Sequence, residues 1–452
     1  MKFLILPLLA FLAACAPPPV PNAPRQEPMR LSFPSVQAFA GDSPGPATRA
    51  NIDMARDFLD LAFQMESGRP LPVLTRFEGP ITVALRGRTT ALTRRDLDRL
   101  ILRLRREAGI NISMVAGPTA NIVIESVPNA ALKRLAPNAA CFVVPRVQSW
   151  TELQAARGTG ALDWGTLPRR DRAAIFLPSD VTPQEVRDCL HEELAQALGP
   201  LNDLYRLPDS VFNDDNINTV LTGFDMLMLR AFYAPELQSG MTRDQVAARL
   251  PAILRRLNPR GEGIPARFPP PTTPLWKSQV ERALSEGRSD RQRRIAAQRA
   301  VEIAEQLGWD GPRLGFAHYA NGRLQIDNDP SRALASFNAA MATYRADPET
   351  RIHRAFVALQ IAAYTLISGN AEATIAVTKA AIPLARRHEN AALLSLLMMF
   401  QAEALDLQGN RAAGMALRLD SLGYGLYGFG SRDEVVARLN EIASLPPQQP
   451  QM

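Results

Sequence analysis

Apolar residues in the first half of the chain recur with two different periods. Spacings of three and four residues predict a helix over residues 47–66 and another that begins at Thr93, where Asp96 completes an N-terminal capping pattern. Short alternating or continuous apolar runs predict five strands, over residues 81–86, 110–115, 121–126, 141–145 and 172–178. This mixture of helices and strands indicates an α+β domain over residues 47–257.

Two more helices in this domain have clear start signals. Thr182 is the predicted N-cap of the first, with Glu185 three residues later, and Gly199 is its predicted end. Thr222 and Asp225 form the same pattern at the start of the second helix. We expect a loop after the first of these helices.

The pattern beyond residue 275 is helical throughout. Asp329, Asn370 and Asn410 begin three similar corners that repeat about every 40 residues, which is the length of a helix pair. The region resembles a degenerate tetratricopeptide-type (TPR-like) repeat domain, and a generic all-α bundle is the alternative. The predicted order after the first domain is a proline- and glycine-rich linker over 258–274, the helical domain over 275–445 and a disordered tail over 446–452.

The chain begins with the sequence MKFLILPLLAFLAACAPPP. Lys2 precedes an apolar run over residues 3–11, which is typical of a secretory signal and is shorter than a membrane span of about 20 residues. The tetrapeptide Leu-Ala-Ala-Cys that ends at Cys15 resembles a bacterial lipobox. The resemblance implies a signal peptide over 1–14 and acylation of Cys15, and the alternative is an ordinary signal peptide with a chance cysteine. Residues 15–46 would then be a lipidated, proline-rich tether.

Ala16 follows this cysteine, where an aspartate would favour retention in the inner membrane. The lipobox resemblance therefore implies an anchor in the outer membrane, with the protein facing the periplasm. The chain has 51 Lys and Arg against 45 Asp and Glu, and the two signs are interspersed, so we expect no nucleic-acid partner. With Cys15 acylated, Cys141 and Cys189 remain as a candidate disulfide in an oxidising compartment, or as two buried thiols.

The stretch CLHEELAQALGPLND, over residues 189–203, raises the question of metal chemistry. On a helical wheel of about 100° per residue, Glu193 falls in the buried stripe, whereas His191 points to another side and is expected at the surface. Read from Glu192, the spacing resembles the metzincin zinc motif H-E-x-x-H-x-x-G-x-x-H. The corresponding positions hold Glu192, Glu193, Gln196, Gly199 and Asn202, and Asp203 follows them.

The residue types at these positions depart from a metzincin. Glu193 stands at the general-base position, but Glu192, Gln196 and Asn202 stand where the three zinc-binding histidines would be. Zinc prefers Cys and His ligands, and amide oxygens suit Ca²⁺ or Mg²⁺ better. We therefore predict no bound metal and no cofactor, and expect Glu192, Gln196 and Asn202 to form a hydrogen-bonded cluster.

The resemblance continues after the helix. Phe212 stands where a matrixin has the methionine of its Met-turn, so the match covers roughly residues 75–235 and implies a zincin-like (metzincin-like) fold. The whole chain also resembles a group of proteobacterial lipoproteins that is defined by a domain of unknown function (DUF2927). That group carries the same Glu-Glu-x-x-Gln signature and has no settled activity.

These patterns leave three functional hypotheses. The first is a non-catalytic pseudo-metalloprotease that binds a periplasmic peptide or protein, because a zincin cleft can bind an extended peptide along an edge strand. The second is a hydrolase or peptidase. It would either be zinc-free, with Glu192 and Glu193 as acid and base and Glu193 at the general-base position, or depend on a hard ion held by Glu192, Gln196, Asn202 and Asp203. The third is a structural spacer in the periplasm. The loss of zinc ligands favours the first hypothesis.

Overall fold

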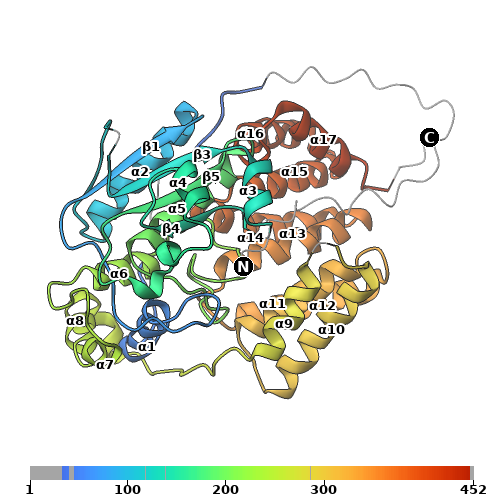
Figure 1. The fold of residues 1–452 in the computed structure, drawn as a ribbon. Helices are drawn as coiled ribbons and strands as arrows, with labels where there is room; N and C mark the ends of the chain where they lie inside the picture. The colour runs from blue at the N-terminus through green and yellow to red at the C-terminus, as the bar shows by residue number, and fades with distance from the viewer. Residues whose placement is uncertain (1–32, 40–44, 118, 138, 286, 448–452) are drawn as a thin grey trace. The chain divides into compact units, whose positions relative to one another are not determined.

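The computed structural model describes residues 33–39, 45–117, 119–137, 139–285 and 287–447 (Figure 1). The predicted signal peptide, the predicted acylation site Cys15 and residues 448–452 of the predicted tail lie outside this part of the chain. The described residues form two compact units. The first unit comprises residues 45–272, and the second comprises residues 33–39 together with residues 273–447.

The first unit contains a mixed five-stranded sheet with the strand order β2-β1-β3-β5-β4. Its strands are β1 (Ile81–Gly87), β2 (Ile112–Met114), β3 (Ile122–Val127), β4 (Phe142–Pro145) and β5 (Ala173–Pro178). All the pairs are parallel except β4 with β5, which is antiparallel and places β4 at an edge. All five strands lie where the apolar runs predicted them. Every residue of β5 is buried, which explains its continuous apolar sequence.

Helices cover both faces of this sheet. They are α1 (Asn51–Ala62), α2 (Ala91–Glu107), α3 (Asn129–Leu135), α4 (Trp150–Ala156), α5 (Pro183–Leu198), α6 (Gly223–Phe232), α7 (Arg243–Ala247) and α8 (Leu250–Leu257), with 3₁₀ turns at Gly160–Leu162, Trp164–Thr166 and Pro259–Gly263. Ile175 of β5 belongs to the large core that includes α1, α2, α5, α6 and α8. Its neighbours Ala174 and Phe176 pack with Leu132 of α3 and Leu153 of α4. Successive β5 side chains thus enter opposite layers.

Helix starts in this unit follow local capping chemistry. At the start of α5, the Glu185 amide donates to the Thr182 hydroxyl at 3.2 Å, and the Glu185 carboxylate accepts from the Thr182 amide at 2.9 Å. The predicted start of α2 at Thr93 is displaced by one turn, because Thr90 is the cap and accepts from the Thr93 amide at 3.0 Å. Each cap satisfies amides that have no partner within their own helix.

Cys141 and Cys189 form a disulfide that joins the residue before β4 to α5. Both residues are buried in the large core of the first unit. The pairing that the compartment and the cysteine count favoured is therefore confirmed. The cross-link holds the edge strand of the sheet against the helix that carries the metzincin-like register.

The second unit contains helices and no strand in its described residues, as the sequence predicted for residues 275–445. Its helices are α9 (Pro274–Leu284), α10 (Asp290–Gln306), α11 (Pro312–Gln325), α12 (Pro330–Arg345), α13 (Arg351–Ile367), α14 (Ala371–Arg387), α15 (Ala391–Leu407), α16 (Arg411–Phe429) and α17 (Arg432–Ala443). Each helix packs against the next one along the chain. Within the described ranges, we find no helix with the length and apolar character that a membrane crossing requires.

The three repeated corners lie at equivalent helix starts. Asp329, Asn370 and Asn410 are the N-caps of α12, α14 and α16, so one repeat corresponds to one pair of helices. The side chains of Asp329 and Asn370 each accept from the amide three residues later at 3.0 Å. Gly369 and Gly409 precede two of these caps with φ of 73° and 79°, a conformation that glycine adopts without steric cost.

His388 follows α14. We expect its protonation to lower the free energy of unfolding of the second unit at acidic pH. Burial, together with the nearby His353, Arg351 and Arg387, lowers the pKa of His388 to about 4. An unfolded histidine titrates near 6.5. Since the folded unit favours the neutral form, the stability that is present above about pH 6.5 is lost as the pH falls toward 4. The free energy of unfolding should decrease by about 2 kcal/mol from pH 7.5 to pH 5.

The substitution His388→Gln should remove most of this pH dependence. Hydrogen exchange followed by mass spectrometry over α13 to α15, with intrinsic rates corrected for pH, measures the change. Lys379→Gln is the matched control, because it replaces an exposed charged side chain of the same helix. A wild-type free energy of opening that is the same at both pH values would contradict the prediction.

Candidate functional site

Arg170 lies buried at the C-terminal end of α5. Its guanidinium donates to the carbonyl oxygens of Gln196 and Ala197 at 2.5 and 2.8 Å, and also to the carbonyl oxygen of Gly199. These carbonyls lie at the C-terminal end of the helix, where no amide of the same helix can donate to them. The negative end of the helix dipole is at the same place. Burial lowers the pKa of Arg170 to about 10, so the side chain stays charged at neutral pH. One cation therefore stabilises both the last turn of α5 and the start of the following loop.

The predicted general-base residue lies inside the core. Glu193 is 0 % exposed, and it belongs to the same helix turn as the core residues Leu190 and Leu194. Glu192 is half-buried, and Gln196, one turn further along α5, is buried. The wheel therefore placed Glu193 correctly on the buried side. The Glu193 side chain is therefore part of the core in this structure.

Asn202 links the loop that follows α5 to the helix α1. Its Nδ2 donates to the backbone carbonyl of Asp60 at 2.9 Å, and its Oδ1 accepts from the amide of Asp203 at 3.0 Å. The position that would hold the third zinc histidine is thus a link between two segments of the fold. Its amide group makes the hydrogen bonds that such a buried link requires.

His191 is 5 % exposed, so the expectation of a surface histidine was wrong. Its Nδ1 accepts from the backbone amide of Leu221 at 3.0 Å. Burial lowers the pKa of His191 well below its usual value, with Arg103 and Arg187 contributing. The neutral ring therefore connects α5 to the residues just before α6, and it stabilises the loop.

Buried side chains hold the loop over residues 199–222, which contains no helix or strand. The carboxylate of Asp225 accepts from the amides of Val211 and Thr222 at 3.2 and 2.8 Å. Arg206 lies 2.8 Å from two carboxylates of α1. Burial raises the pKa of Asp225, and these hydrogen bonds partly oppose that effect. The loop is therefore held by specific polar contacts.

Two other positions of the register are explained by packing. Phe212, at the Met-turn position, is completely buried, and its carbonyl accepts from the Leu204 amide at 2.9 Å. A Cβ atom at Gly199 would lie 2.8 Å from the ring of Phe232, so α6 can approach the loop only because residue 199 is glycine. Both residues therefore serve the core of the first unit.

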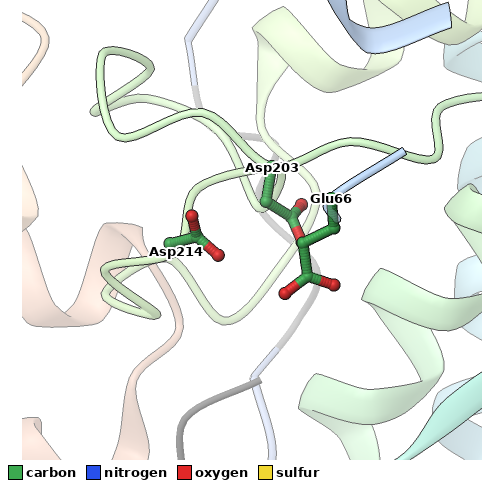
Figure 2. Close-up of side chains that lie close together, drawn as sticks. All are labelled: Glu66, Asp203 and Asp214. Atoms are coloured by element: carbon green, nitrogen blue, oxygen red, sulfur yellow. The ribbon is translucent and has the colours of Figure 1, made fainter. Parts of the chain in front are cut away.

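Three carboxylates lie close together where this loop passes the end of α1 (Figure 2). They belong to Glu66, Asp203 and Asp214, and one oxygen from each lies within 4.8 Å of the others. Asp203 and Asp214 are buried, and Glu66 is partly exposed. The Glu66 amide donates to the Leu201 carbonyl at 3.0 Å, which fixes the residues after α1 beside the loop.

Such a group of carboxylates is chemically suited to a divalent cation. Carboxylates at this separation repel one another, and a cation or a proton relieves the repulsion. Oxygen donors favour Ca²⁺ or Mg²⁺, whereas zinc sites usually include Cys or His. Among the described residues, the acidic, His and Cys side chains that could jointly hold an ion are Glu66, Asp203 and Asp214. Of these, the register had singled out Asp203.

Sequence reasoning missed Glu66 and Asp214 for different reasons. Glu66 follows α1 and has no motif that links it to residues after α5. Asp214 lies in the run Asn-Asp-Asp-Asn over residues 213–216, and this density of carboxylates and amides was the one local signal. The packing of α1 beside the loop was required to bring the three together.

The residues that build this site lie in one continuous part of the chain. Arg170, α5, the loop and the three carboxylates are all within the first unit. No curated protein matches the chain. Residues 51–252, which include the residues of this site, match the model of a family described as Protein of unknown function (DUF2927).

Proposed function

We propose that the first unit is a non-catalytic, metzincin-like domain that binds a peptide or protein. The observation that carries this proposal is that residues at the positions of a metzincin zinc motif make structural contacts within the fold. Asn202 joins the loop to α1, and Glu193 is fully buried. A zinc site needs side chains that converge on one ion, and hydrolysis needs a base that reaches the substrate.

The edge strand β4 supports a binding role. The strand order ends at β4, which pairs with β5 on one side, and the disulfide attaches its start to α5. A strand edge that is held in place can bind an extended peptide through main-chain hydrogen bonds. Pro145 has no amide hydrogen, so residues 142–144 would form the binding edge.

The N-terminal sequence and the helical second unit also support this proposal. The lipobox-like sequence at Cys15 supports an acylated anchor in the outer membrane, with both units in the periplasm. The repeated caps of α12, α14 and α16 support a TPR-like solenoid, whose stacked helix pairs offer a surface for a protein partner. Together these features describe a tethered recognition protein of the cell envelope.

Binding and turnover are tested together on the full chain with a library of unstructured peptides. We expect saturable binding without cleavage, whether Zn²⁺ is present or absent. An N-methylated copy of the best-binding peptide should bind at least about tenfold more weakly, because strand addition requires its amide donors. Peptide cleavage that disappears in Glu193→Gln would contradict the proposal and establish an enzyme.

The carboxylate group favours a second candidate, a hydrolase that depends on a hard metal ion near Asp203. Equilibrium dialysis of the full chain with Ca²⁺, Mg²⁺, Mn²⁺ and Zn²⁺ tests it. If this candidate holds, Asp214→Asn abolishes ion binding and peptide cleavage together, while the neighbouring control Asp215→Asn preserves both. Ion binding without turnover would assign the group a structural role and leave the non-catalytic proposal in place.

A further inference from the structure

Residues 33–39, which we call the strap, belong to the second unit and contact its helices α16 and α17, although the sequence placed them in the tether. The Gln37 amide donates to the carbonyl of Gly423 in α16 at 3.0 Å. Glycine inside a helix costs about 0.5–1 kcal/mol relative to alanine. A Cβ atom at Gly423 would lie 2.9 Å from Cβ of Gln37 and 3.3 Å from the carbonyl oxygen of Ser35. The helix thus carries a destabilising residue at the point where the strap approaches its backbone.

Aromatic residues anchor both ends of the strap. Phe39 is buried, and its ring centroid lies 5.4 Å from that of Tyr424 in α16. At the other end, the guanidinium of Arg432 in α17 lies 5.4 Å from the ring centroid of Phe33. Tyr424 is held from within the helical unit, because Arg386 of α14 donates to its hydroxyl at 2.6 Å. The helices therefore supply an aromatic surface, a cation and a main-chain acceptor.

We propose that α14, α16 and α17 form a recognition groove for an extended peptide with an aromatic residue near each end, and that the strap occupies this groove in cis. A main-chain hydrogen bond combined with side-chain pockets is a general mode of peptide recognition. A segment of the same chain competes intramolecularly, at an effective concentration that does not depend on the protein concentration, so the strap excludes free peptides of the same kind. The groove becomes available when the strap is released, and this holds whatever the first unit binds.

The experiment uses the full chain with Phe33→Ala and Phe39→Ala, which weakens the strap and leaves the groove unchanged. The probe is a fluorescent peptide with the sequence of residues 31–41, LSFPSVQAFAG. It should bind this double variant at least about tenfold more tightly than the wild-type chain, in which the intact strap competes. Val36→Ala is the matched control, because Val36 is an exposed residue of the same strap and its loss should leave binding at the wild-type level.

Gly423→Ala, added to the double variant, tests the groove itself. The new Cβ atom obstructs the strap path, so the gain in peptide binding should disappear, and the helix should become more stable because alanine has the higher helix propensity. Unfolding of α16 therefore cannot account for the loss of binding. In the otherwise wild-type chain, Gly423→Ala should also speed hydrogen exchange at the Gln37 amide. Failure of the folded double variant to bind better than wild type, or binding that survives Gly423→Ala, would overturn the proposal.

Discussion

Joint replacement of Cys141 and Cys189 by alanine is expected to lower the free energy of unfolding of the first unit by about 4 kcal/mol. The two cysteines are separated by 48 residues, and their bond restricts the unfolded chain over that whole length. Small domains typically have a stability of only about 5–15 kcal/mol, so the loss would be a large share of the total. Hydrogen exchange over the buried strand β5 reports the opening of this unit.

Reduction of the wild-type protein is the control for this prediction. It breaks the cross-link and leaves both sulfur atoms in the core, so it should cost slightly less than the double substitution. Exchange over α13 to α15 in the second unit should stay unchanged. Equal stability of the oxidised and reduced wild-type first unit would contradict the account.

Arg170→Met is expected to destabilise the first unit by roughly 3–5 kcal/mol. Methionine retains part of the apolar stem but removes the donors to three buried carbonyls at the end of α5. It also removes the stacking of the guanidinium on Trp164, whose ring centroid lies 4.8 Å away. Urea unfolding of the full chain, followed through exchange over α5, measures the effect.

Arg169→Met is the matched control for Arg170→Met. Arg169 is the adjacent residue, and its pairing with Asp171 is solvent-exposed on both sides. Exposed pairs contribute about 0–1 kcal/mol, so this variant should remain close to wild type. If Arg170→Met were no more destabilising than Arg169→Met, the last turn of α5 would not depend on this cation.

Local sequence signals predicted elements whose causes are also local. Thr182 and Glu185 start α5 because they satisfy the amides of that helix's own first turn. The uninterrupted apolar run of β5 predicts a strand buried on both faces. Thr93 shows the limit of this reasoning, because Thr90 precedes it by one turn and is equally able to cap a helix. The helix α2 begins at the earlier threonine.

The candidate site was predicted only in part. The metzincin-like stretch suggested Glu192, Gln196, Asn202 and Asp203 as a possible hard-ion site, and of these four Asp203 lies beside two other carboxylates. The same stretch gave no account of Asn202, whose partner is on α1. A helical wheel placed His191 away from Glu193, but it carries no information about which loop covers that side of the helix. Here the residues before α6 cover it, and His191 is buried.

By itself, the sequence determined where the five strands and the capped helix α5 lie, the mixed first half and helical second half, and the cysteines available for a disulfide. Each of these depends on periodicity or composition within a short window. The tertiary structure alone decided that Arg170 binds the end of α5, that Glu66 lies beside Asp203, and that the strap packs on α16. These contacts join segments far apart in sequence, and their geometry is set by how layers of helices and strands pack together.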